Sequence, residues 1–120
     1  MRFLMLIHVD ETADAGGPPD SLVEAIETFR ADTTYGRWLD DGGLAASTDA
    51  LWLRTDAGRV THPDGPFVES KEVVGGFFVV ESPSVGDMAR WATAFADLHA
   101  EHWPGLAYTA QVRQIVDPTP

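Results

Sequence analysis

The sequence predicts an α+β domain with the ferredoxin-like (split βαβ) arrangement, in which an antiparallel sheet carries two helices on one face. Two observations support this prediction. The predicted elements follow one another in the order β-α-β-β-β-α-β. The chain has 120 residues and 44% hydrophobic residues, which suits one domain with a single core. We therefore treat residues 1–120 as one domain.

The N-terminal third is predicted to contain a strand, a loop and a helix. The strand covers about residues 2–9, because its centre is continuously apolar. The loop at 10–19 ends in a run of glycines and prolines. A helix is expected over about 21–41, because apolar residues recur every three to four positions, and Gly42 and Gly43 would end it.

The middle of the chain is predicted to form strands. Residues 50–55 and 59–62 are expected to pair as a hairpin, with Gly58 in the left-handed conformation of the turn. A longer, strongly apolar strand is expected over 73–81.

The C-terminal part is predicted to contain the second helix and the last strand. The helix covers about 84–101 and carries a clear apolar stripe. The strand covers 108–116, and about 117–120 form a tail.

Two of these strands are apolar on both faces, which predicts a homodimer. Every residue of 3–7 and of 77–80 is apolar, although side chains alternate between the two faces of a sheet. The helices cover only one face, so a second copy of the sheet is the economical cover for the other. A loop crossing that face is the alternative.

Charge and composition exclude several classes of function. The chain has 19 acidic and 8 basic residues and a net charge of −11, so it lacks the clustered cations that bind nucleic acid or an anionic membrane. It has no cysteine, which excludes disulfides and thiol chemistry. No apolar run reaches the ~18 residues of a membrane span, and the apolar start is too short for a signal sequence. We therefore expect a cytoplasmic protein.

The segment 64–72, with the sequence DGPFVESKE, is the densest polar cluster and is followed by Gly-Gly-Phe-Phe at 75–78. This pattern resembles the signature of the DGPF group within the YCII-related family, and the resemblance covers nearly the whole chain. It implies a ferredoxin-like domain that pairs, sheet against sheet, into a dimeric α+β barrel.

The resemblance gives less guidance on function. Better-known relatives have a histidine–aspartate pair proposed for acid–base chemistry, and one related activity is a dehydrochlorination. In those relatives the histidine lies on the first helix. This chain has no histidine between Ser21 and Gly43, so that pair does not carry over.

Other residues must then carry any acid–base role. His8 ends the first strand, and Asp10 or Asp64 could be its carboxylate partner, so these three are the predicted catalytic residues. The alternative for His8 is an inert residue at a strand end. Asp64 is also explained by the chemistry of the Asp-Gly-Pro turn alone.

A second set of residues is predicted to bind the substrate. Lys71 beside Glu69 could hold an anionic group, His62 lies near the same turn, and Trp52 could line a pocket. His99 and His102 are three positions apart on a helix and could face one metal ion, or His102 could simply pack at the helix end. We predict no metal site, and no motif for a cofactor is present.

Two functions fit these residues about equally well. One is a cofactor-free lyase, dehydratase or isomerase that acts on a small organic molecule by histidine–carboxylate acid–base chemistry. The other is a non-catalytic module that binds a small ligand or regulates a partner. An adaptor whose acidic surface recognises a basic protein is a third possibility.

Overall fold

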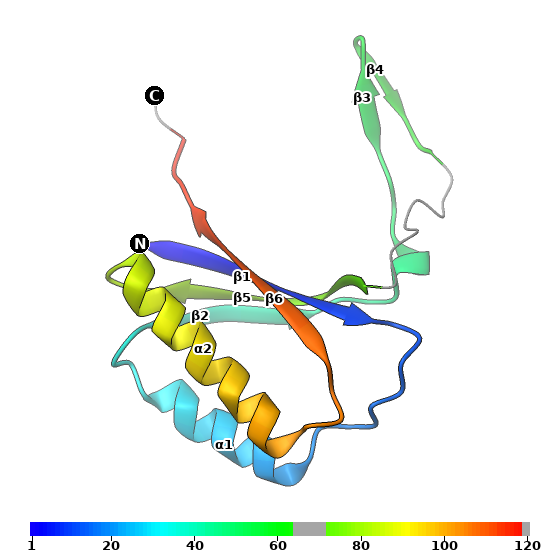
Figure 1. The fold of residues 1–120 in the computed structure, drawn as a ribbon. Helices are drawn as coiled ribbons and strands as arrows, with labels where there is room; N and C mark the ends of the chain where they lie inside the picture. The colour runs from blue at the N-terminus through cyan, green and yellow to red at the C-terminus, as the bar shows by residue number, and fades with distance from the viewer. Residues whose placement is uncertain (64–71, 119–120) are drawn as a thin grey trace.

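The structure is a computed structural model, and it describes residues 1–63 and 72–118. It contains a main sheet, a separate hairpin and two helices (Figure 1). The strands are β1 (Arg2–Asp10), β2 (Arg37–Gly43), β3 (Arg54–Asp56), β4 (Arg59–Thr61), β5 (Glu72–Glu81) and β6 (Tyr108–Ile115). The helices are α1 (Asp20–Ala31) and α2 (Val85–His102), and a short 3-10 turn, η1, covers Ser47–Asp49.

The main sheet confirms the predicted fold class. Its strand order is β2-β5-β1-β6, and every neighbouring pair is antiparallel. Both helices lie on the same face of this sheet (Figure 1). Without the hairpin, the chain runs β-α-β-β-α-β with the first and third sheet strands at the centre, which is the ferredoxin-like arrangement.

The prediction of one long helix over 21–41 was wrong at its C-terminal half. Helix α1 ends at Ala31, and the Asp32 carboxylate accepts hydrogen bonds from the backbone N–H and the hydroxyl of Thr34. Such local bonds compete with the helical ones and favour a turn. The chain then enters β2, where Trp38 packs on the core face of the sheet.

The hairpin in the middle of the chain is shorter than predicted and stands apart from the main sheet. Strands β3 and β4 pair only with each other among the described strands. Ala57 and Gly58, between them, have φ values of 49° and 77°. Two successive left-handed residues are typical of a two-residue hairpin turn, so the left-handed conformation expected for Gly58 is confirmed.

The core lies between the sheet and the helices and centres on Phe95. Its ring centroid lies between 4.8 and 5.8 Å from those of Phe29, Trp38, Phe78 and Trp91. These rings come from α1, β2, β5 and α2. One buried side chain therefore joins both helices to the sheet, and aromatic contacts of this kind add to the burial of apolar area.

The opposite face of the sheet carries an apolar centre. Leu4 pairs with Val79 and Leu6 with Phe77, and all four side chains are half-buried. On the helix face, by contrast, Met5 is 0% exposed. No described helix lies on the opposite face (Figure 1). We call this surface the open face. The homodimer predicted to cover it stays a prediction.

If two open faces meet, a charge at Leu6 will prevent dimer formation, because an unpaired carboxylate in an apolar contact costs several kcal/mol. Leu6→Asp should lower the mass measured by light scattering from twice the chain mass of 13.0 kDa to the chain mass itself. Val23→Asp, on the exposed side of α1, is the control and should leave the dimer intact. A wild-type chain that is monomeric at high micromolar concentration contradicts the prediction.

Candidate functional site

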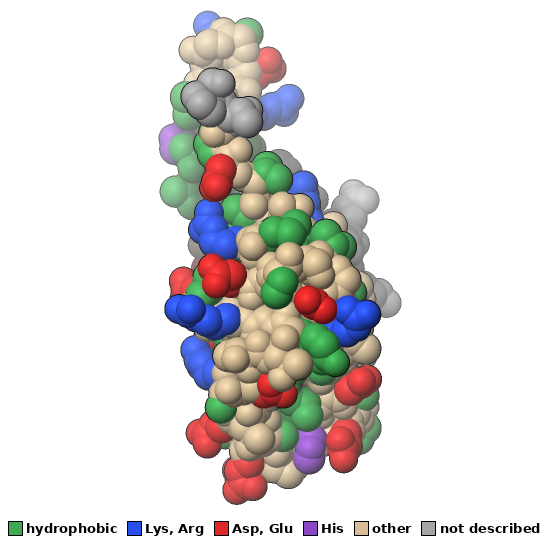
Figure 2. All heavy atoms as spheres, turned by 90° about the vertical axis from the view of Figure 1, so that its left-hand side faces the viewer, with side chains coloured by type: hydrophobic (Ala, Val, Ile, Leu, Met, Phe, Trp, Pro, Cys, Tyr) green, Lys and Arg blue, Asp and Glu red, His purple; other side chains and the backbone are tan. Residues whose placement is uncertain are grey.

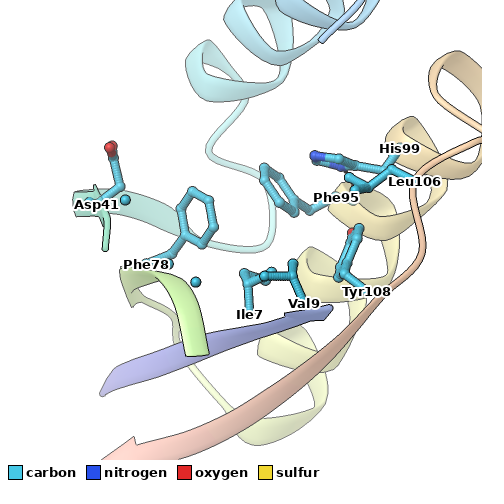
Figure 3. A pocket seen from close by; sticks show the side chains of 12 residues that line it. Ile7, Val9, Asp41, Phe78, Phe95, His99, Leu106 and Tyr108 are labelled. Carbon is cyan, nitrogen blue, oxygen red and sulfur yellow. The ribbon is translucent and has the colours of Figure 1, made fainter. Parts of the chain in front are cut away.

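A pocket of about 260 Å³ lies on the helix face of the sheet, at the end where β1 finishes and β5 begins. It opens between the sheet and the C-terminal half of α2 (Figure 3). Its lining residues are Ile7, Val9, Asp41, Gly42, Gly43, Gly75, Gly76, Phe78, Phe95, His99, Leu106 and Tyr108. Most of them are apolar, so the polar groups at this site are few and separate.

Four glycines line the sheet side of the pocket. They come in two pairs, at 42–43 on β2 and at 75–76 on β5, where the pairing of β5 with β1 is irregular. A Cβ at Gly75 would lie 2.6 Å from Cγ2 of Val9, so a side chain at position 75 would require Val9 to move. A Cβ at Gly43 would meet nothing within 4 Å. A side chain at position 43 would therefore enter the pocket without a clash.

His99 stands in the last turn of α2, and its hydrogen bond defines the state of its ring. Nδ1 lies 2.9 Å from the carbonyl oxygen of Phe95. A carbonyl oxygen only accepts, so Nδ1 must carry the proton. In the neutral ring the lone pair is then on Nε2, which is free to accept a proton. The imidazole also packs against the Phe95 ring, with centroids 4.6 Å apart.

Tyr108 is the first residue of β6 and packs edge-on to His99, with ring centroids 5.2 Å apart and an interplanar angle of 79°. Its hydroxyl is directed towards Phe95 and His99 (Figure 3). This oxygen is buried and has no hydrogen-bond partner among the described residues. Burial, and secondly the negative charge of Asp97, raises the pKa of the Tyr108 hydroxyl. The group is thus an unused donor that keeps its proton at neutral pH.

Asp41 stands across the pocket from His99 and Tyr108 (Figure 3). Its carboxylate lies 3.4 Å from the guanidinium of Arg30, and both side chains are more than one-third exposed. The Arg30 guanidinium also lies 4.4 Å from the centroid of the Trp38 ring. This ion pair lies at the solvent-exposed rim of the pocket, whereas aromatic side chains line its interior.

The structure does not bring His8 and Asp10 into this pocket. His8 lies on β1 opposite Val74 and Thr109, one position out of step with the core-facing residues. Its ring makes no hydrogen bond to another described residue. The Asp10 carboxylate accepts hydrogen bonds from the backbone N–H and the hydroxyl of Thr12, at 2.9 and 2.6 Å. The catalytic role predicted for this pair stays a prediction.

The other predicted site residues lie along the hairpin or outside the described residues. Trp52 precedes β3 with 42% of its surface exposed, and His62 follows β4 and is exposed. Neither lines the pocket beside His99. The remaining three, Asp64, Glu69 and Lys71, lie outside the described residues.

The sequence pattern suggested only metal binding for His99 and indicated no role for Tyr108. Within the described ranges, no three His, Cys, Asp or Glu side chains gather as a metal site. The available signal for His99 was its position four residues after Phe95, which places it on the core face of the helix. Tyr108 gave no signal, because its position depends on the pairing of β6 with β1.

A comparison with protein families matches the model of the YCII-related domain to residues 1–103. The chain belongs to the YCII-related family. The match covers His99 but ends before β6, so Tyr108 lies beyond it. Membership of the DGPF group stays a prediction from the 64–72 motif. No curated protein matches the chain. Among the described residues of this YCII-related chain, no helix has the length and apolar character needed to cross a membrane.

Because burial raises the pKa of the Tyr108 hydroxyl, we expect this group to ionise at a higher pH than an ordinary tyrosine. The folded chain holds the phenol proton more tightly than the unfolded chain, whose tyrosines ionise near pH ~10. The stability that this proton provides is therefore complete below pH ~10 and is lost as the pH rises through the higher folded-state pKa. An ultraviolet titration of the wild-type chain minus that of Tyr108→Phe isolates this group. A difference signal that appears at or below pH ~10 contradicts the assignment.

Proposed function

We propose that this YCII-related protein is an enzyme of the lyase, dehydratase or isomerase class, which moves a proton on a small organic substrate in the His99–Tyr108 pocket. The observation that carries the proposal is the pair of polar groups on the α2 and β6 side of a mostly apolar cavity, across from the Asp41 carboxylate at its rim. His99 has a free Nε2 because Nδ1 donates to Phe95, and the Tyr108 hydroxyl is a buried donor without a partner among the described residues. A base beside a donor is the arrangement that proton abstraction next to a carbonyl requires.

The proposed step uses each group once. The substrate carbonyl oxygen accepts a hydrogen bond from the Tyr108 hydroxyl, and Nε2 of His99 takes a proton from the neighbouring carbon. The electron pair of that C–H bond forms a C=C bond, while the carbonyl π electrons move onto the oxygen. The Phe95 carbonyl oxygen, 2.9 Å from Nδ1, supports the positive charge that the imidazole gains. The carbonyl then re-forms as the electron pair on oxygen moves back. In a substrate with a C=C bond between the β and γ carbons, the electrons shift along the chain and the γ carbon takes the proton from the imidazolium, which isomerises the double bond. In a substrate with a leaving group on the β carbon, the bond to that group breaks, the C=C bond remains between the α and β carbons, and the departing group takes the proton.

The pocket also limits the substrate. A volume of about 260 Å³ and a lining of Phe78, Phe95 and aliphatic side chains suit a compact, uncharged and mostly apolar molecule. The Tyr108 hydroxyl oxygen is buried, so the tyrosine ring must rotate for the hydroxyl to reach a bound substrate. Once reached, the hydroxyl bonds a ligand oxygen without competition from solvent.

The second candidate function, binding without catalysis, is favoured by one observation. Catalytic histidines are commonly oriented by a carboxylate. Here the carboxylate that lines the pocket, Asp41, pairs with Arg30, and His99 is oriented by a backbone carbonyl instead. A pocket with a weakly supported base would still bind a carbonyl compound.

Proton exchange distinguishes the two functions. A panel of small uncharged ketones that includes phenylacetone is incubated with the protein in D₂O, and NMR measures deuterium entry next to the carbonyl. An enzyme should accelerate the exchange, and His99→Gln should slow the catalysed rate by roughly 100- to 10,000-fold. Tyr108→Phe should slow it as well. His102→Gln changes a histidine one turn later that does not line the pocket, and should keep the wild-type rate.

Binding is followed separately by the amide chemical shifts of the pocket residues. Gly43→Leu fills the pocket from an unobstructed position and should abolish the ketone-induced shifts. Shifts in the wild-type protein without deuterium entry contradict the enzyme and support the binding module. A panel that produces neither shifts nor exchange contradicts both functions.

A further inference from the structure

The β3–β4 hairpin and the residues that lead into it form an arm, which we define as residues 51–62. The arm projects from the body on the side of the sheet away from the helices (Figure 1). The radius of gyration is 16.8 Å, whereas a compact domain of 120 residues has about 14 Å. Figure 2 shows the arm standing clear of the body. The fold therefore holds a segment of chain away from its own core.

The side chains of the arm are unusually apolar for such an exposed segment. Leu51, Leu53 and Val60 are 76%, 59% and 61% exposed. An isolated two-stranded hairpin is marginally stable in water, because it has no third layer on which to bury its apolar side chains. Among the described strands, β3 and β4 pair only with each other. The arm thus has the composition of a segment that packs on another surface.

The root of the arm is fixed to the body. The Glu11 carboxylate accepts hydrogen bonds from both the backbone N–H and the hydroxyl of Ser47, each at 2.8 Å. The backbone N–H of Leu44 donates to the carbonyl of Gly75 at 2.9 Å. These bonds clamp the chain just before the arm to β5 and to the segment after β1. The direction of the arm is therefore set by the fold.

The length and charge of the arm both suit a second copy of the chain. The eight residues from 50 to 57 span about 26 Å when extended, whereas two packed sheets lie about 10 Å apart. An arm of this length passes the sheet of a partner placed on the open face. It also carries Arg54 and Arg59 against the single carboxylate of Asp56, in a chain whose net charge is −11. Another copy offers a strongly acidic body to this basic segment.

We propose that the arm is a dimer clasp: each protomer reaches past the sheet interface and packs Leu53 and Val60 on the body of its partner. This inference rests on the sheet-face dimer predicted above and is independent of the chemistry of the pocket. It explains why apolar side chains are retained on a segment that stays exposed beside the described residues of its own chain. It also gives Glu11 a positioning role, since its hydrogen bonds to Ser47 aim the arm.

The test compares dimer affinities by sedimentation equilibrium. The double variant Leu53→Ser with Val60→Ser should raise the dimer dissociation constant at least tenfold. Val85→Ser is the matched control, because Val85 is 62% exposed, almost the same as Val60, but lies on the helix face. It should leave the dissociation constant unchanged. Glu11→Ala should also weaken the dimer, because the arm loses its fixed direction.

Hydrogen exchange gives a second and independent measurement. Amides of β3 and β4 should be protected in the wild-type dimer and should lose that protection in the Leu6→Asp monomer. The proposal is overturned if the arm variants dimerise like the wild type, or if the hairpin amides exchange equally fast in dimer and monomer. A monomeric wild-type chain overturns both the clasp and the sheet-face dimer. Proton exchange by the pocket is measured separately, so its result does not depend on these outcomes.

Discussion

The packing of Phe95 is the interaction on which the rest of the structure depends. Its buried ring contacts aromatic side chains from both helices and from two strands, so it fixes the position of α2 over the sheet. Its backbone carbonyl accepts the hydrogen bond from Nδ1 of His99, one turn further along the helix. Phe95 thus packs the core through its ring and sets the tautomer of His99, the proposed base, through its carbonyl oxygen. The tightly packed Phe95 therefore holds the His99 ring in a fixed orientation at the pocket.

The pocket exists because the sheet leaves the space under the end of α2 unfilled. Close-packed interiors normally fill such spaces with side chains. Here paired glycines of β2 and β5 line the space, the Gly43 position is open to it, and the pairing of β5 with β1 shifts beside them. Glycine within a strand weakens it, so these positions cost stability. Under the proposed function, this loss of stability leaves room for a ligand that accepts a hydrogen bond from the Tyr108 hydroxyl.

The sequence predicted the parts of the fold that long apolar patterns specify: β1, β5, α2 and the ferredoxin-like order. It misplaced the end of α1, because one Asp32–Thr34 turn outweighs a weak apolar repeat over the following residues. The site was harder to predict. His99 and Tyr108 meet through the packing of α2 and the pairing of β6 with β1. The spacing of His99 from Phe95 indicates only its helix face, and the pairing of β6 leaves no local pattern at Tyr108. The residues named from the 64–72 motif lie outside the described part of the chain, so their roles stay predictions.

The central claim is that Nε2 of His99 is a free base because Nδ1 carries the proton. Long-range ¹H–¹⁵N correlation spectra of the imidazole groups, assigned with His99→Gln, identify the protonated nitrogen directly. For the neutral ring of His99, we expect a protonated Nδ1 and an unprotonated Nε2. A neutral ring with the proton on Nε2 would contradict it, because the hydrogen bond to Phe95 would then be absent and the pocket would face a donor instead of a base.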